Sequence, residues 1–222
     1  MPYRPLDFEA AKRHRSAWVV LPNSLYDPER GAAEYDSYLD MLVYAEELGF
    51  DGIGVNEHHQ TAYGLMPAPN LIASAVIQRT KRVKIAILGR ALPLVGNPLY
   101  IAEELAMLDN LSKGRVIAGF VRGIGAEYHA SGVNPAFSHK RFHEAHDLIV
   151  KAWTEPGPFN WEGDQYNYDY VNTWPRVYQQ PHPPIWIPSQ GSIETIEWAA
   201  APERRYPFLV TFSPEEAVER NL

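Results

Sequence analysis

"PLYIAEELAMLDNLSKGRVIAGFVRGIG", residues 98–125, is the stretch that decides the fold class of this 222-residue chain. Pro98 opens a helix that we expect to run to about Leu111, and the residues Ser-Lys-Gly at 112–114 end it. Residues 115–120 then form a short, continuous apolar run, which is typical of a strand buried on both faces. A helix, a buried strand and a glycine-containing loop in this order predict one unit of a parallel α/β fold.

The same alternation runs through the chain and predicts six strand–helix units. Further strands are expected at 16–21, 51–55, 83–88, 184–188 and 206–212, and further helices at 33–48, 70–79, 138–153, 192–200 and from 213 onward.

One insertion, residues 154–183, interrupts this rhythm. It contains two aromatic-alternating runs about a polar turn, which predict a β-hairpin. Tyr166, Tyr168 and Tyr170 would share one face of that hairpin. They either pack onto the outer helices or form a face on which a ligand stacks.

Composition and charge exclude several classes of function. The formal net charge is −7 without a block of like charges, so nucleic acid and anionic membranes are poor partners. The chain has no cysteine, which excludes disulfides, thiolate metal sites and cysteine nucleophiles. The N-terminus lacks the apolar region of a signal peptide, and no apolar run approaches the ~20 residues of a membrane span. A cytoplasmic protein is therefore expected.

Glu57, His58 and His59 follow the strand at 51–55 and are candidate site residues. Neighbouring residues of an extended segment point to opposite sides, so the two histidines are not expected to share a metal ion. Either one histidine is a general acid/base oriented by its neighbours, or it is hydrogen-bonded beneath a loop. The run HEAHD at 143–147 is one residue short of a zinc-protease helix motif and is interpreted as a helix flank.

Two other strand ends carry residues suited to an anion. Arg122 follows the strand at 115–120 and precedes two glycines, which suits a phosphate but also an ordinary surface arginine. Gly191 and Ser192 open a helix with Thr195 in its first turn, where N–H groups and the helix dipole favour negative charge. If strands 115–120 and 184–188 are neighbours, both features converge on one anion. Gly89 follows the third strand in a tight turn, where the backbone can approach closely.

Five motifs together resemble the bacterial luciferase-like family of flavin-dependent monooxygenases. They are NEHHQTAYGLMPAPN (56–70), LGRALPLVGNP (88–98), AEELAMLDNLSKGRV (102–116), GFVRGIGAEYHASG (119–132) and PPIWIPSQGSIETIEWAA (183–200). The resemblance implies a (β/α)8 TIM barrel with the flavin across its C-terminal mouth. It implies that reduced FMN arrives from a separate flavin reductase and reacts with O2 to oxidise a small organic substrate. It also allows a homodimer.

The resemblance assigns roles to individual residues. His58 matches the catalytic histidine of the family, and Glu57, beside it in the motif, is expected to be catalytic as well. Arg122 matches the arginine on the FMN phosphate, and Gly191, Ser192 and Thr195 match the helix start on the same phosphate. Gly89 matches the turn under the isoalloxazine ring, where some members have a non-prolyl cis peptide. The turn 92–98 is a residue longer here than in some members, which leaves the place of that peptide open.

Three alternatives stay open at this point. The chain could be a deazaflavin-dependent hydride-transfer oxidoreductase of the same superfamily or a flavin-binding protein without turnover. A metal-dependent barrel hydrolase fits least, because no two histidines have a metal-site spacing. A complete barrel takes about 250 residues. We therefore expect residues 1–222 to form a single partial barrel domain, truncated at its C-terminal end after about six units, with little activity alone.

Overall fold

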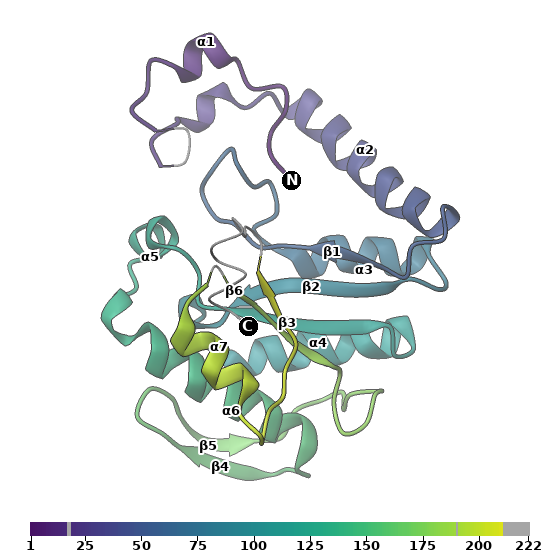
Figure 1. Ribbon diagram of the computed structural model, residues 1–222, viewed down its shortest axis with the longest axis vertical. Helices are drawn as coiled ribbons and strands as arrows, with labels where there is room; N and C mark the ends of the chain where they lie inside the picture. The colour runs from purple at the N-terminus through teal and green to yellow at the C-terminus, as the bar shows by residue number, and fades with distance from the viewer. Residues whose placement is uncertain (17–18, 190, 211–222) are drawn as a thin grey trace.

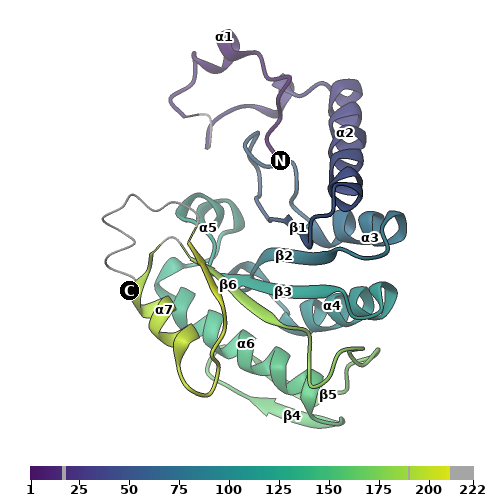
Figure 2. The same ribbon diagram turned by 45° about the vertical axis from the view of Figure 1, so that its right-hand side comes forward.

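A computed structural model of the chain describes residues 1–210 except 17, 18 and 190. Its centre is a five-stranded parallel sheet in the order β1-β2-β3-β6-β7, curled like half of a barrel (Figure 1). Helices α3, α4 and α6 follow one another around the outer side of the sheet (Figure 2). The five strands occur in the sheet in the same order as along the chain. The two strands between β3 and β6 in the sequence, β4 and β5, form a separate hairpin.

The structure gives the following bounds. The strands are β1 (Gly52–Val55), β2 (Lys84–Ala91), β3 (Val116–Val121), β4 (Phe159–Glu162), β5 (Asn167–Val171), β6 (Ile185–Ser189) and β7 (Phe208–Val210). The α-helices are α1 (Phe8–Ala11), α2 (Pro28–Glu47), α3 (Pro69–Arg79), α4 (Pro98–Ser112), α5 (Gly125–Ser131), α6 (Ser138–Thr154) and α7 (Ile193–Ala200). Three short 3₁₀ turns are η1 (Asn23–Leu25), η2 (Leu92–Leu94) and η3 (Pro135–Phe137).

The signals that end each helix are local. In α4, the Asn97 side chain accepts a hydrogen bond from the Leu99 amide, and Pro98 occupies the first turn. At the other end, Lys113 adopts the left-handed conformation and Gly114 follows at φ +85°. These caps explain why the helix expected at 98–111 and the strand expected at 115–120 both appear in the structure.

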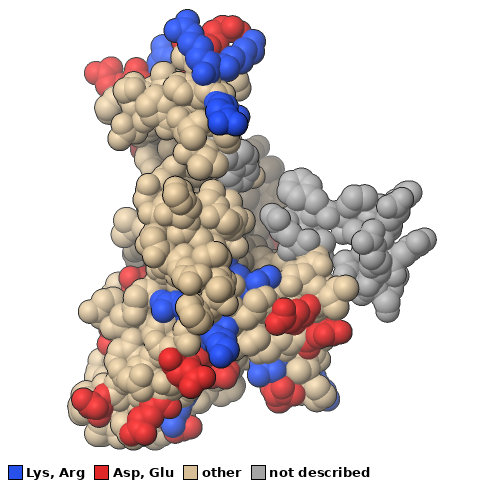
Figure 3. Space-filling model, turned by 90° about the vertical axis from the view of Figure 1, so that its left-hand side faces the viewer, with Lys and Arg blue, Asp and Glu red and all other residues tan. Residues whose placement is uncertain are grey.

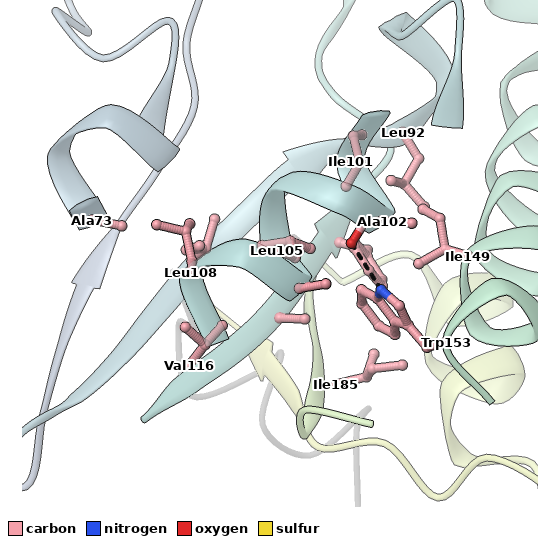
Figure 4. Packing of buried hydrophobic residues seen from close by; sticks show 14 of the residues in the cluster. Ala73, Leu92, Ile101, Ala102, Leu105, Leu108, Val116, Ile149, Trp153 and Ile185 are labelled. Atoms are coloured by element: carbon pink, nitrogen blue, oxygen red, sulfur yellow. Dashed lines mark hydrogen bonds between the residues drawn. The ribbon is translucent and has the colours of Figure 1, made fainter. Parts of the chain in front are cut away.

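The hydrophobic core lies between the sheet and the outer helices. Figure 4 shows Leu105 from α4, Ile149 and Trp153 from α6, and Ile185 from β6 meeting there. Trp153 is 2% exposed, and its indole nitrogen donates to the Ala102 carbonyl at 2.9 Å. Each such large apolar side chain contributes ~1.5–3 kcal/mol by its burial. This packing holds β3 and β6 side by side.

The predicted strand at 16–21 is wrong for the part that the structure describes. Residues 16 and 19–21 form no strand, and residues 17 and 18 lie outside the described part. Val19 and Val20 are 52% and 49% exposed, so these two apolar side chains lie outside the core. A parallel strand is stabilised by cover on both faces, and this segment belongs instead to a lobe above the sheet (Figure 1). The helix expected from 213 onward also lies outside the described residues.

The insertion at 154–183 does contain the predicted hairpin, with β4 and β5 antiparallel. The packing interpretation is right for two of its tyrosines. Tyr166 is 5% exposed beneath the Arg141 guanidinium, and the Tyr168 hydroxyl donates to the Asn97 side chain at 2.9 Å. Tyr170 is 65% exposed and does not share their environment.

Charged side chains are unevenly spread over the face in Figure 3. Lys and Arg are prominent at the upper end beside some acidic residues, the lower end carries acidic residues mixed with Lys and Arg, and the middle of the face carries few charges. Among the described residues, no helix combines the length and the apolar character that crossing a membrane requires.

Candidate functional site

The carboxyl ends of β1, β2, β3 and β6 meet around a cavity of about 350 Å³, which we call the strand-end cavity. Parallel strands bring their carboxyl ends to one edge of the sheet, and this edge is the usual place for function in such folds. Six of the seven predicted site residues line the cavity: Glu57, His58, Gly89, Arg122, Ser192 and Thr195. The seventh, Gly191, is adjacent to Ser192 in the chain.

Arg122 and the start of α7 converge, as the sequence predicted. β3 and β6 are hydrogen-bonded neighbours. The Arg122 guanidinium donates to the Ser192 hydroxyl at 3.3 Å, and the Thr195 hydroxyl donates to the same oxygen at 3.1 Å. The Ser192 side chain makes no capping hydrogen bond to the amides of α7. A guanidinium, two hydroxyls and the start of a helix therefore point to one place.

His139 on α6 also belongs to this cluster. Its Nε2 lies 2.5 Å from Nη1 of Arg122, and its Nδ1 lies 3.1 Å from a carboxylate oxygen of Glu194. Because a guanidinium only donates, Nε2 is the accepting nitrogen, and the neutral ring carries its proton on Nδ1, on the side of Glu194. The ring therefore holds the guanidinium at the cavity wall.

The floor of the cavity includes Leu88 and Gly89, at a bulge of β2. The register between β2 and β3 shifts between Ile87 and Arg90, and the Leu88–Gly89 peptide is cis. A Cβ at Gly89 would meet the Gly119 carbonyl of β3 at 2.8 Å. Glycine is thus required here by the neighbouring strand. The sequence left the place of such a peptide open, and the structure has it directly before Gly89.

His58 is held from two sides. Its Nδ1 lies 3.0 Å from a carboxylate oxygen of Glu127, at the start of α5, and the other oxygen of Glu127 accepts from the Ile124 amide at 3.0 Å. Gly64 packs so closely that a Cβ there would lie 2.5 Å from the His58 Cβ, and Tyr63 lies edge-on to the imidazole. The loop at 60–64 therefore fixes the ring position.

Glu127 is a carboxylate in a nearly buried place, with its side chain 4% exposed. Burial by itself favours the neutral acid, but the hydrogen bonds from His58 and the Ile124 amide hold the pKa of Glu127 below its ordinary value. A charged Glu127 accepts from Nδ1 of His58, so the neutral imidazole carries its proton on Nδ1. Nε2 is then the nitrogen that can accept a proton.

Glu57 has a different environment from His58. One of its carboxylate oxygens lies 2.9 Å from Nε2 of His59, and the other lies 2.8 Å from Nε of Arg90. The Glu57 side chain is 2% exposed. The hydrogen bond to Glu57 raises the pKa of His59, although burial opposes the shift. The structure thus separates the two adjacent histidines, each with its own carboxylate.

Three members of the site were not identified from the sequence. Glu127 has a local signal, since it stands in the first turn of a short helix after a glycine-rich loop. Arg90 directly follows Gly89, but its carboxylate partner lies on another strand end. His139 has no local signal, because it is 17 residues from Arg122 and on a different element. Among the described residues, no group of His, Cys, Asp or Glu has the arrangement of a metal site.

A family model described as "Luciferase-like monooxygenase" matches residues 15–222. The alkanal monooxygenase alpha chain of Photobacterium leiognathi is 30% identical over 178 residues, which are 80% of this chain and 49% of that protein. The crystal structure of the monooxygenase RslO1 from Streptomyces bottropensis has a TM-score of 0.76 at 32% identity, covering 84% of this chain and 57% of that one.

Two more distant structures share the fold. The FMN complex of the oxygenating constituent of 3,6-diketocamphane monooxygenase from Pseudomonas putida has a TM-score of 0.74 at 22% identity, covering 84% of this chain and 54% of that one. An F420-dependent secondary alcohol dehydrogenase has a TM-score of 0.69 at 20% identity, covering 84% and 61%. With the curled parallel sheet, these neighbours confirm the expected barrel-family fold class.

The chain spans about half the length of the alkanal monooxygenase relative that it matches. The residues that the family model matches, 15–222, include every strand end that lines the cavity. The chain belongs to the luciferase-like monooxygenase family.

Proposed function

We propose that this chain binds FMN in the strand-end cavity and serves an FMN-dependent monooxygenase reaction on a small organic substrate. In such a reaction, one atom of O2 enters the substrate and the other leaves as water, with two electrons from the reduced flavin. The observation that carries the proposal is the convergence of Arg122, Ser192 and Thr195 at the start of α7. Reduced FMN would come from a separate flavin reductase.

The residues present fit a flavin phosphate. Arg122 offers a planar, always charged donor that matches phosphate oxygens, and α7 adds its N-terminal amides and dipole. Thr195 is 6% exposed and Ser189 is 9% exposed, so these hydroxyls belong to a formed pocket rather than to open surface. The left-handed Gly191, at φ +93°, turns the chain from β6 into the helix. FMN, once bound, supplies the electrons for oxygen chemistry.

His58 serves as the proton-handling residue in this proposal. Its ring lines the same cavity and is 20% exposed on its side chain. The Glu127 contact fixes the tautomer, so Nε2 accepts a proton from the reacting substrate and returns it. Glu57 is a positioning residue for the loop: it ties His59 and Arg90 together and so supports the backbone on which His58 stands.

The test is flavin binding by the 222-residue chain. We expect Arg122→Ala to weaken the binding of oxidised or anaerobically reduced FMN by ~1.5–3 kcal/mol, the range for a lost charged hydrogen bond. Arg79→Ala is the matched control, because Arg79 pairs with Asp40 on the surface. Isothermal titration measures both. An FMN dissociation constant that is the same in wild type and Arg122→Ala would refute the phosphate site.

Isothermal titration with F420 and with reduced FMN distinguishes the deazaflavin-dependent alternative from the FMN-dependent monooxygenase. The F420-dependent neighbour shares the fold, so the strand-end cavity is compatible in outline with either coenzyme. Tighter binding of F420 than of reduced FMN would favour hydride transfer without O2. Tighter binding of FMN favours the monooxygenase.

A further inference from the structure

A second, larger cavity lies on the other side of His58. It has a volume of about 540 Å³, and we call it the N-terminal cavity. Its walls come from Tyr3, Leu6 and residues within 19–26, from Tyr35 of α2 and from the loop at 58–67. Two backbone hydrogen bonds close the N-terminal segment onto that loop, from Tyr3 N to Ala62 O and from Leu65 N to Met1 O, each 2.8 Å long. The cavity is therefore a built feature of two segments distant in the sequence.

The lining of this cavity carries no formal charge. Among the described residues that line it there is no Asp, Glu, Lys or Arg, and the titratable groups there are three tyrosines and His58. Apolar side chains such as Leu6, Leu25 and Leu65 form much of the wall. An ion placed here would lose water without gaining a partner of opposite charge, which is strongly unfavourable.

Several polar side chains of the wall are already engaged by the backbone. The Tyr35 hydroxyl donates to the Leu65 carbonyl, the Tyr3 hydroxyl accepts from the Asp27 amide, and the Thr61 hydroxyl accepts from the Tyr63 amide. These groups hold the walls together, so they offer little to a highly polar ligand. The volume falls within the ~300–1,000 Å³ range of pockets for small organic ligands.

His58 links the two cavities, because it lines both of them. We propose that the N-terminal cavity binds the organic substrate, and that this substrate is an uncharged, mainly apolar molecule that presents its reacting group to His58. This assignment of a substrate class rests on the proposed function. In this arrangement the anionic phosphate of FMN lies in the strand-end cavity beside Arg122. The neutral substrate lies in the N-terminal cavity and reaches His58 from there.

Binding of matched neutral and anionic probes tests the inference without turnover. The probes are 2-acetylnaphthalene and 2-naphthoate, which share a ring system and differ in charge. By isothermal titration, we expect the ketone to bind the 222-residue chain at least ~10-fold more tightly than the carboxylate. Equal or tighter binding of the carboxylate would overturn the substrate class.

The variants Thr61→Asp and Thr61→Asn test whether the ketone binds in the N-terminal cavity. Both side chains can keep the hydrogen bond from the Tyr63 amide, as Asx turns do, but only Asp adds a charge to the wall. We expect Asp to weaken ketone binding at least ~10-fold and Asn to change it by less than ~3-fold. Leu71→Asp, at a 73% exposed position of α3, controls for nonspecific apolar binding. Unchanged ketone binding in Thr61→Asp would show that the ligand lies elsewhere.

FMN titrations keep this inference separate from the proposed function. Thr61→Asp should leave FMN binding unchanged, and Arg122→Ala should leave ketone binding unchanged. Loss of ketone binding in Arg122→Ala would put the ketone in the strand-end cavity and overturn the inference. Failure of FMN to bind the wild type, with Thr61-dependent ketone binding intact, would instead refute the flavin site and retain the neutral-ligand cavity.

Discussion

At the scale of single residues, the site is organised by three paired contacts between side chains. His58 pairs with Glu127, His59 pairs with Glu57, and Arg122 pairs with His139. Each pair joins a residue after one strand to a residue of another element or of the same loop. The pairs fix ring orientations and determine which nitrogen of each neutral imidazole carries the proton.

The first residue-scale prediction concerns the His58 tautomer. At alkaline pH, where imidazoles are neutral, ring ¹⁵N shifts of wild-type protein should show the proton on Nδ1 of His58, because Glu127 accepts from that atom. Glu127→Leu removes the acceptor and should produce a mixture of tautomers. Glu127→Gln retains an acceptor oxygen and should keep the wild-type tautomer.

His59 is the internal control for that measurement. Its contact to Glu57 is through Nε2, so its proton should stay on Nε2 whatever residue occupies position 127. A wild-type His58 with its proton on Nε2, or a tautomer that does not change in Glu127→Leu, would contradict the positioning role of Glu127.

At the scale of elements, the end of α2 is tied to the start of β2 by one carboxylate. The Glu46 side chain accepts from the amides of Lys81, Arg82 and Val83, at 2.9, 2.6 and 2.8 Å. Partial burial opposes its charge, but these amides lower the pKa of Glu46 to about 2. The carboxylate therefore accepts hydrogen bonds from three backbone amides that directly precede β2.

This carboxylate predicts a pH-dependent contribution to stability. A depressed folded-state pKa contributes stability that is fully present above the unfolded value, near 4.5, and is lost as the pH falls toward about 2. Glu46→Gln should thus lower the urea midpoint at pH 7, and its difference from wild type should shrink steadily below about pH 4.5.

Urea unfolding at pH 7, 5 and 3, followed by circular dichroism, makes that comparison. Glu47→Gln serves as the control, because Glu47 is an exposed neighbour at the end of the same helix. A difference between Glu46→Gln and wild type that is constant across this pH range would show that the amide contacts do not depend on the charge.

At the scale of the whole molecule, the described strands form an open, curled sheet with helices on its outer side. One face of α2 stays apolar and exposed: Met41, Tyr44 and Leu48 are 57%, 55% and 59% exposed and lie at spacings of three and four. Such a stripe on the solvent-facing side of a helix is unusual for a surface that faces only water.

The homodimer that the family resemblance allows would cover this stripe. We expect sedimentation velocity to show self-association that increases with protein concentration. Tyr44→Lys should reduce it, because a charge then replaces an apolar side chain at the centre of the stripe. Lys12→Ala, in the N-terminal lobe after α1, is a control that should not change the association. A wild-type chain that is monomeric at all concentrations would refute the dimer.

Much of the fold could be predicted from the sequence because its determinants are local. Continuous apolar runs such as 115–120, with Pro98 before the helix and Gly114 after it, specify a buried parallel strand and its helix within one window. The sequence predicted the approach of Arg122 to Ser192 only on the condition that their strands are neighbours, and the structure meets that condition. The apolar run at 16–21 shows the limit, since composition alone does not say whether a segment finds neighbours on both faces.

The partners within the site were decided only by the tertiary structure. That His58 would pair with Glu127, and that His139 would lie against Arg122, depends on contacts between residues 69 and 17 positions apart in the chain. The neutral cavity beside His58 likewise exists only once the N-terminal segment closes onto the loop at 58–67. Amino-acid sequence determines which chemical groups stand at each strand end. Packing determines which of them meet, because hydrogen bonds and burial depend on separations of a few ångströms that no local pattern encodes.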